Sequence, residues 1–482
     1  MSYTTPDVYF KDVSAGASSI EQSSASVGCM FGVTPAGVIN ELVKVTSWTE
    51  YVNTFANGLE SPFMENQDLS YAVYGFFANG GKELYVANIR KTDHATEDNN
   101  AKKAVITDET TGITLTAYAE GTAYNGIKMT ITKSAFFAEG TYEAYDVKLT
   151  LGTTAVNISE VTADNIISAI NNDITAKYWV VAEANSLTLA ETTMTLAGGR
   201  DGIDSLSDVD FVKALSLLDE NQDVMLVAVP GRTSTALTTA LLSYCDENRL
   251  FPIIDVPSGS TVTEVKEKRR AYSAKGGVLA YPWGYITDPA SSDDTLRLVP
   301  TCGAIMGLYA RFINAYGVWV APAGINATIR GFVKLEKKLT NDEVGQLNMA
   351  GVVSILSKPN VGIVAWGARG LNNDKSMKYV TDVLLNYTIK NDIYDGTQFA
   401  VFKPNDESLW NDVSGVISTY LENLRSEGAL KGSSSEAYRV ICDSSNNTNE
   451  TIENGYLYID VAYAPVKPAE FIVIRLAHQM NN

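Results

Sequence analysis

The 482-residue sequence has very few residues of the kinds that most often carry enzymatic chemistry. It contains two histidines, His94 and His478, and four cysteines with no CxxC pair among them. So few histidines disfavour the common His-dependent reactions, and isolated thiols indicate neither a disulfide framework nor a zinc site. We therefore expect the cysteines to be buried and reduced. They are Cys29, Cys245, Cys302 and Cys442.

Long apolar runs and an excess of positive charge are also missing. The run Val224–Val229 is far too short to cross a bilayer. The first residues, MSYTTPDVYFKDV, show no signal-peptide pattern of basic residues followed by an apolar stretch. With 37 Lys and Arg against 56 Asp and Glu, the net charge is −19, which offers no electrostatic footprint for nucleic acid or anionic lipid. We expect a soluble chain made in a cytoplasm, with no nucleic-acid partner and no membrane insertion.

The residues that are present suit a folded chain with several domains. Hydrophobic residues make up 45% of the sequence and charged residues 19%, which excludes a disordered chain. At roughly 150 residues per domain, the length suggests about three domains. The 25 tyrosines combine a rigid apolar ring with a polar hydroxyl, a combination that suits large hydrated interfaces.

Two parts of the sequence alternate between helical and strand patterns. Residues 27–90 indicate a strand, two helices and a strand, and residues 211–281 indicate three successive helix–strand steps. Such alternation predicts a mostly parallel sheet covered by helices. Between these parts, residues 92–197 are rich in threonine and carry short alternating runs at 113–117, 127–131, 145–151 and 186–190, with one helix at 162–170. We interpret this stretch as a small β-rich domain inserted into the α/β body.

The last third of the chain predicts two long helices, at about 377–389 and 407–427. The second has apolar residues at helical spacing from Leu409 to Leu424, a cap at Asn405 or Asp406, and a stop at Gly428. Short β-prone runs lie near both chain ends, Val8–Phe10 behind the small, polar segment 14–26 and Phe471–Leu476 behind two prolines. Such runs are not expected to form stable structure alone.

The predicted fold class is therefore a multidomain α/β protein. We expect an N-terminal arm at 1–26, a middle α/β domain at 27–91 and 198–354, the inserted β-rich domain at 92–197, and an α+β C-terminal core domain with a C-terminal arm at 355–482.

Motifs of enzymatic chemistry give only weak signals. Neither a P-loop nor a GxSxG elbow is present. The segment Gly198–Gly202 permits a phosphate loop, but a tight turn at a domain junction is the better interpretation. Asp293 and Asp294 are compatible with a catalytic carboxylate pair, but a solvated loop is the favoured interpretation. His478 is compatible with a general base, but a surface residue is the favoured interpretation. Asp255 follows a predicted parallel strand, where an α/β enzyme places a catalytic carboxylate; a cap or turn role is the alternative.

Several motifs occur in an order that resembles one family. They include Pro6-Asp7-Val8-Tyr9, Val27–Gly32, Thr46-Ser47-Trp48, Phe76–Gly81, Leu308–Arg311, Gly317-Val318-Trp319, Ala321–Gly324, Trp366–Arg369, Phe402–Asp406, Gly428–Gly432 and Pro465–Phe471. The order resembles the contractile tail sheath family of phage tails, phage-derived bacteriocin particles and related injection machines. Departures, such as Asp7 where the family has glycine and Gly370 where it usually has threonine, affect single positions.

The resemblance implies a structural protomer with no enzymatic activity, cofactor or metal. Family members form stacked six-membered rings around a tail tube, contract, and drive the tube through a cell envelope. Their partners are other copies, the tube, the baseplate and the tail terminator. The particle is a virion tail or a released bacteriocin, assembled in the host cytoplasm. The core domain lies nearest the tube, and the inserted domain faces outward.

The resemblance also implies that both arms add strands to a neighbour's sheet. The expected arm residues are Asp7, Val8, Tyr9, Phe10, Phe471, Ile472, Val473, Ile474 and Arg475. For the tube contact we expect a small polar surface made by exposed charges of the two C-terminal helices. These candidates are Lys378, Asp382, Lys390, Asp412, Glu422 and Arg425. The alternatives are an α/β hydrolase-like enzyme acting at Asp255 and a surface-array or capsid-like protein.

Overall fold

The structure, a computed structural model, describes residues 20–473 apart from 222, 292 and 294. The chain forms two compact units. The larger unit joins Ser24–Leu384 to the segment that begins at Lys467, and the smaller unit joins Leu385–Val466 to the segment that ends at Ser23. The division at Leu384 falls inside the helix α9 (Val380–Gly396).

An eight-stranded sheet forms the centre of the larger unit, with the strand order β18-β17-β13-β12-β11-β1-β3-β2. The six strands from β17 to β3 run parallel to their neighbours, and β18 and β2 join the two edges antiparallel. The mostly parallel sheet predicted from the helix–strand alternation is therefore present. Its strands are β1 (Gly28–Gly32), β2 (Leu42–Val45), β3 (Leu84–Asn88), β11 (Leu226–Ala228), β12 (Phe251–Ile254), β13 (Val278–Tyr281), β17 (Val352–Lys358) and β18 (Gly362–Trp366).

Seven α-helices accompany this sheet in the described part of the larger unit. They are α1 (Trp48–Phe55), α2 (Leu69–Ala78), α4 (Asp208–Ala214), α5 (Thr235–Asn248), α6 (Val262–Ala271), α7 (Cys302–Tyr316) and α8 (Asn341–Ala350). The helix starts follow local chemistry, since Ser47 caps α1, and Thr261 and Thr340 form capping boxes with Glu264 and Glu343. A side chain on Gly303 or Gly307 of α7 would collide with the backbone of α2, so glycine is needed where these helices meet.

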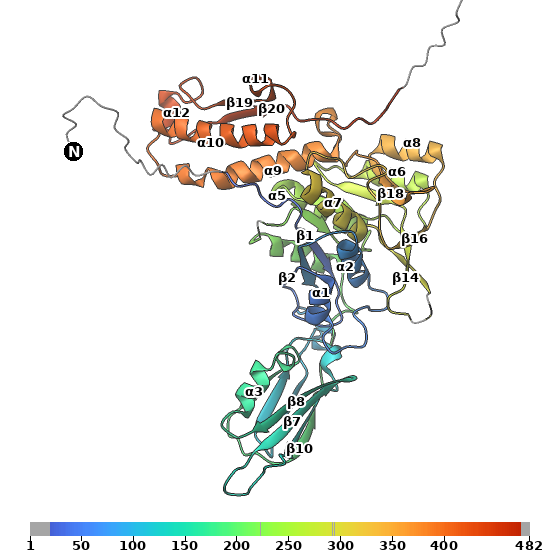
Figure 1. Cartoon of the computed structure of the whole chain (residues 1–482), viewed down its shortest axis with the longest axis vertical. Coiled ribbons are helices and arrows are strands. Elements are labelled where there is room, and N and C mark those ends of the chain that lie inside the picture. Colours follow the sequence, from blue (N-terminus) through green and yellow to red (C-terminus); the bar gives the residue numbers. More distant parts are fainter. Residues whose placement is uncertain (1–19, 222, 292, 294, 474–482) are drawn as a thin grey trace, which may run out of the picture. The chain divides into compact units, whose positions relative to one another are not determined.

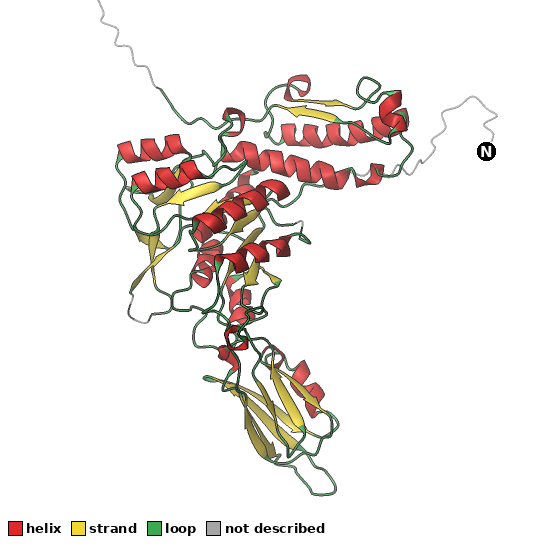
Figure 2. Ribbon diagram, turned by 180° about the vertical axis from the view of Figure 1, so that it is seen from behind, coloured by secondary structure: helices red, strands yellow, loops and turns green. Residues whose placement is uncertain are grey.

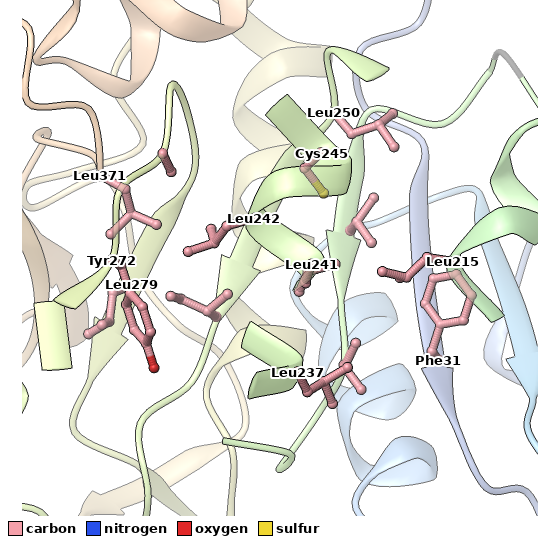
Figure 3. Close-up of a cluster of buried hydrophobic side chains, with 14 of the residues drawn as sticks. Phe31, Leu215, Leu237, Leu241, Leu242, Cys245, Leu250, Tyr272, Leu279 and Leu371 are labelled. Atoms are coloured by element: carbon pink, nitrogen blue, oxygen red, sulfur yellow. The ribbon is translucent and has the colours of Figure 1, made fainter. Parts of the chain in front are cut away.

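The main core of the larger unit lies between α5 and the sheet. Figure 3 shows Leu237, Leu241 and Cys245 of α5 facing the strands, with Phe31 of β1 and Leu279 of β13 among the surrounding side chains. All four cysteines are buried and free, as the sequence predicted.

Residues 105–195 form two smaller antiparallel sheets with the orders β10-β6-β7-β8 and β4-β5-β9. Figure 2 shows this region as strands accompanied by the short helix α3 (Ile166–Asn172). The expected strand at 186–190 is absent; in this segment the Thr188 backbone N–H donates a hydrogen bond to the Thr111 carbonyl at 3.1 Å. The strands are β4 (Val105–Thr107), β5 (Ile113–Ala117), β6 (Lys128–Lys133), β7 (Tyr145–Leu151), β8 (Thr154–Val161), β9 (Val180–Ala184) and β10 (Thr192–Thr195).

A further sheet of the larger unit has the order β15-β14-β16, with strands Leu296–Val299, Gly284–Thr287 and Phe332–Leu335. The 3-10 helices of the described residues are η1 (Glu97–Asn99), η2 (Thr122–Tyr124), η3 (Ala176–Tyr178), η4 (Leu215–Leu218), η5 (Lys375–Met377) and η6 (Gln398–Ala400).

The smaller unit is built on the second part of α9 and on α10 (Glu407–Ser426). The apolar stripe predicted for α10 is buried from Leu409 to Leu424, and Asp406 caps the helix. Figure 1 shows α10 beside the two-stranded sheet of β19 (Tyr438–Ile441) and β20 (Asp460–Tyr463), and α10 contacts β19. The short helices α11 (Ser434–Ala437) and α12 (Asn449–Glu453) complete the unit.

The boundary expected between residues 354 and 355 falls inside β17. Because β17 pairs with β13, and β18 pairs with β17, this hairpin belongs to the large sheet. The change to the smaller unit comes at Leu385.

Candidate assembly surfaces at the chain ends

The segment that ends at Ser23 is fixed to the smaller unit by a buried carboxylate. Asp392 of α9 accepts hydrogen bonds from the Ser23 backbone N–H at 3.0 Å and from the Tyr420 hydroxyl of α10 at 2.6 Å. Burial raises the pKa of Asp392, although these two donors oppose the increase. Ile20 lies against Gly396, where a larger residue would collide with it. The chain is therefore held at a defined place where the described residues begin.

The expected N-terminal arm residues Asp7, Val8, Tyr9 and Phe10 lie outside the described residues. The arm and linker were expected to extend to residue 26. The structure shortens this segment, because Ala25 and Ser26 are buried and Ser26 donates a hydrogen bond to Asn314.

The chain leaves β20 along a short, well-bonded path in the smaller unit. Ala464 donates to the carbonyl of Ala437 at 2.8 Å and accepts from Lys431 at 2.8 Å. Val466 then donates to the carbonyl of Ala429 at 3.1 Å. These bonds hold the backbone up to the point where the last segment begins.

Two ion pairs anchor the last segment within the larger unit. Lys467 Nζ lies 2.7 Å from the buried carboxylate of Asp382 and donates to the Ser376 carbonyl. Three residues later, Glu470 faces the guanidinium of Arg369, with one oxygen 2.8 Å from Nε and the other accepting from Nη2 at 2.8 Å. A pair in which both carboxylate oxygens lie close to the guanidinium, one of them hydrogen-bonded, fixes direction as well as position.

The Glu470 carboxylate has further partners. Asn348 and Tyr379 both donate hydrogen bonds to it, at 2.7 and 3.3 Å. Burial would raise the pKa of Glu470, but Arg369 and these donors outweigh burial and lower it. The carboxylate is therefore ionised at neutral pH and holds the segment in place.

Three apolar residues follow this anchor, and all are exposed. Phe471, Ile472 and Val473 show 72%, 83% and 78% of their surface to solvent. They were expected to form a strand, yet none is in a strand in this single chain. The physical reason is that a strand needs a neighbouring strand with which to share backbone hydrogen bonds, and this segment has none among the described residues. The remaining expected arm residues, Ile474 and Arg475, lie outside the described residues.

The two-stranded sheet of the smaller unit offers edges of the kind that such a segment needs. Tyr438 to Ile441 pair with Tyr463 to Asp460 in antiparallel register. Among the strands of the described residues, β19 and β20 pair only with each other. A two-stranded sheet is marginal on its own, and its outer edges can accept further strands.

The tube-contact candidates do not form one exposed surface. Asp382 is only 2% exposed and is paired with Lys467, so its expected exposure is wrong. Lys378 precedes α9 and is half-buried, with Nζ 4.5 Å from the ring centre of Tyr379. Glu422 and Arg425 are partly buried and pair with each other on α10. Lys390 of α9 and Asp412 of α10 are exposed as expected.

Asp255 is engaged as a helix cap. One of its oxygens accepts the backbone N–H groups of Thr301 and Cys302 at 3.1 and 2.9 Å, at the start of α7. Burial raises its pKa to about 6, and the Cys302 bonds oppose the shift. The carboxylate is 6% exposed and bonded to backbone, so the cap role that the sequence left open describes its contacts.

The segment Gly198–Gly202 is a junction, as the sequence favoured. The backbone N–H of Gly199 donates to Asn125, and that of Arg200 donates to the Lys102 carbonyl. A phosphate loop needs free N–H groups, and these two are already used. Asp201 accepts from the buried guanidinium of Arg90 at 3.2 Å.

The remaining sequence candidates gain no support. His478 and Asp294 lie outside the described residues. Within the residues that the structure places, no group of three potential metal ligands occurs. No helix among them has both the length and the apolar character needed to cross a bilayer.

The anchoring residues Arg369, Asp392, Lys467 and Glu470 were not predicted. Arg369 and Glu470 lie in motifs that carry the family resemblance. The charge of Glu470, between the prolines and an apolar run, was a signal that the sequence offered. Their partners are about 85 to 370 residues away in sequence, so local patterns did not reveal them.

Comparison with known proteins identifies the family. The phage tail sheath protein central domain matches residues 198–371, and the phage tail sheath C-terminal domain matches residues 372–478. The tail sheath protein of Escherichia phage P2 is 25% identical over 255 residues, which cover 52% of this chain and 62% of that protein.

Solved structures share the fold. The sheath tail protein of Listeria innocua aligns with a TM-score of 0.65 at 14% identity, covering 92% of this chain and 95% of that one. The helical sheath of the anti-feeding prophage in its contracted state aligns with a TM-score of 0.62 at 21% identity, covering 99% and 100%. Since the two family domains together match more than half of the sequence, from residue 198 to residue 478, the chain belongs to the phage tail sheath protein family.

Proposed function

We propose that this chain is the structural protomer of a contractile tail sheath, and that copies of it assemble as stacked six-membered rings around a tail tube. The observation that carries the proposal is the C-terminal segment. It is anchored by Glu470 and then exposes Phe471, Ile472 and Val473 with no strand partner. Such a segment is suited to pair with a sheet in another copy.

In the assembly, the acceptor is the sheet of β19 and β20. Strand addition gives backbone hydrogen bonds to both partners and stabilises a sheet that is marginal with two strands. The C-terminal arm, Phe471–Arg475, occupies one edge. The N-terminal arm, Asp7–Phe10, occupies another, after leaving its own copy at Ile20. Each copy would thus be linked to neighbours by backbone pairing at both ends.

The domain division that we propose follows from this role. The middle α/β domain comprises residues 27–91 and 198–384, because β17 and β18 belong to the large sheet. Residues 92–197 form the inserted domain, which faces outward. Residues 385–466 form the core domain nearest the tube. Its tube contact is polar and includes the exposed side chains of Lys390 and Asp412.

Contraction in this proposal draws its free energy from contacts between subunits. The rings are trapped in an extended state, a baseplate trigger releases them, and the subunits rotate outward and drive the tube through an envelope. The tail terminator closes the far end. Relatives of matching fold come from a helical sheath in the contracted state and from a baseplate, which supports this setting. The particle is a phage tail or a prophage-derived particle.

An enzymatic role receives less support. An α/β hydrolase would use a carboxylate such as Asp255 that is free to meet a substrate. In this structure the backbone N–H groups of Thr301 and Cys302, at the start of α7, already donate hydrogen bonds to the Asp255 carboxylate.

Assembly of the purified chain tests the proposal. Negative-stain microscopy should show long tubes for the full chain, alone or with a tail tube protein. A chain lacking residues 1–13 should keep its circular dichroism spectrum and melting temperature but form no tubes, because it lacks one of the pairing arms. Unchanged tubes from the shortened chain would contradict the role of the N-terminal arm. Small, closed oligomers of the full chain at every concentration would contradict the sheath function itself.

A further inference from the structure

The loop between α9 and α10 contains a phenylalanine in an unusual backbone conformation. Ala400 and Lys403 are joined by a hydrogen bond from the Lys403 N–H to the Ala400 carbonyl, at 3.2 Å. Between them, Val401 has φ −64° and ψ 132°, and Phe402 has φ +65°. This is the geometry of a type II turn, in which the third position normally holds glycine or asparagine. Phe402 therefore occupies a position that suits its backbone poorly.

The side chain of Phe402 gains no burial from the described part of its own chain in return. It is fully exposed, at 104% of its reference surface, and Val401 beside it is 55% exposed. A bulky residue at positive φ is an outlier that often marks a functional site. Neither burial against the described residues nor turn preference accounts for a phenylalanine at this position.

Two exposed tyrosines lie in a segment that is hydrogen-bonded to this loop. Asn405 donates a hydrogen bond to the Tyr456 carbonyl at 2.9 Å and accepts one from the indole N–H of Trp410 at 2.7 Å. The loop is thereby tied to the segment after α12. Tyr456 and Tyr458 are 58% and 49% exposed, and their ring centres lie 6.1 Å apart. We call Val401, Phe402, Tyr456 and Tyr458 the tip patch. Exposed aromatic residues on a rigid frame are typical of interface anchors.

The tip patch lies at the same end of the smaller unit as Ile20, where the described chain begins. Ile20 lies against Gly396, the last residue of α9. Only the short turn of η6 separates Gly396 from Val401. Figure 1 shows the end of α9, the start of α10 and α12 together at one end of this unit. The tip patch and Ile20, the first described residue, therefore lie at the same end of the smaller unit.

We infer that the tip patch docks against a second copy of this chain, namely the copy that receives the N-terminal arm. The inference rests on the proposed sheath function and adds a side-chain contact to the backbone pairing of the arm. The Phe402 ring enters an apolar site on the neighbour, and the aromatic pair covers its margin. The turn stays strained because the ring is needed for assembly, a trade of local stability for binding that proteins make at functional sites.

Replacement of Phe402 by residues that suit the turn tests the inference. Phe402→Asn and Phe402→Gly in the full chain both favour positive φ and remove the apolar ring. We expect melting temperatures equal to or above that of the parent protomer. We also expect the protein concentration needed for tube formation, measured by sedimentation and microscopy, to rise at least about tenfold. The matched control is Phe136→Asn, because Phe136 is also an exposed phenylalanine, at 68%, but lies in the inserted region. This control should assemble at the parent concentration.

The outcomes separate the inference from the proposed function. If the parent chain and both Phe402 variants form tubes at the same concentration, the inference is wrong and the sheath function stands. If the variants assemble normally alone but no longer load onto a tail tube protein, the patch faces the tube and the inference is wrong. If the parent chain never assembles, alone or with tube protein, the proposed function fails and the inference fails with it.

Discussion

Asp255 illustrates how one side chain can resemble a catalytic group in the sequence and serve a structural role in the fold. Its place after a strand of a parallel sheet is the position that an enzyme would use. In the structure this position is also next to the start of α7, where unpaired N–H groups attract a carboxylate. An aspartate suits both a catalytic role and a helix-capping role, and only the three-dimensional contacts distinguish the two.

The raised pKa of Asp255 predicts a specific pH dependence of stability. Its pKa is about 6 in the folded chain and 3.8 as an ordinary aspartate. The folded state therefore binds the proton more tightly, and this group's contribution to stability is largest below pH 3.8 and is lost as the pH rises to 6. The contribution to the free energy of unfolding that is lost over this pH range amounts to about 3 kcal/mol, at 1.36 kcal/mol per pKa unit.

Asp255→Asn removes this titration but leaves one acceptor oxygen. The stability cost of Asp255→Asn should therefore be larger by about 2–3 kcal/mol at pH 4 than at pH 7.5. Urea unfolding of both proteins at the two pH values measures the difference. An equal cost at both values would show that the folded Asp255 titrates normally.

At the scale of elements, α10 was predictable because its signals are local. Its apolar spacing, the Asp406 cap and the stop at Gly428 all lie within about 25 residues, and the buried side follows that spacing. In contrast, α9 is covered on several sides, with Asp382 and Thr388 buried along with its apolar residues. Its pattern therefore gave no sign of which charges are exposed.

Elements that depend on distant partners could not be predicted. Asp382 is buried, and its ion-pair partner Lys467 lies 85 residues away in sequence. The run 186–190 alternates like a strand, but in the structure it joins no sheet, and its Thr188 backbone N–H bonds to Thr111. The positions of Glu470 and Arg369 were visible in the sequence, but nothing local joined them. Phe471, Ile472 and Val473 were predicted to form a strand, and none of them is in a strand in the described chain.

The buried stripe of α10 predicts a large effect for its aromatic residue. Trp410 is 7% exposed and donates to Asn405. Trp410→Ala should lower the free energy of unfolding by about 3–5 kcal/mol, because a large buried side chain is removed and a cavity remains. Denaturant unfolding followed by far-ultraviolet circular dichroism measures this. Trp410→Phe, which keeps most of the apolar volume, should cost clearly less, and an alanine variant as stable as the parent would mean that the stripe is not a core.

At the scale of the whole molecule, the insertion at 92–197 joins the α/β body through two adjacent stems. Lys102 and Arg200 exchange backbone hydrogen bonds of 3.0 Å in both directions. Chain ends that lie side by side permit insertion of a region that folds by itself. The region has its own core around Trp179, but Ala36 and Leu59 of the body pack into that core. We therefore expect the two parts to be separable at a modest cost.

Excision of residues 102–200 tests this separability. With a short Gly/Ser bridge from Ala101 to Asp201, the remaining chain should fold, with a loss of roughly 1–3 kcal/mol because Ala36 and Leu59 lose apolar cover. It should still form tubes, since the arms and the smaller unit are untouched. The isolated fragment 102–200 should give a β-type circular dichroism spectrum and a cooperative melt. A fragment without a cooperative transition, or a remainder that is insoluble, would show that the two sheets of the insertion and the eight-stranded sheet fold as one domain.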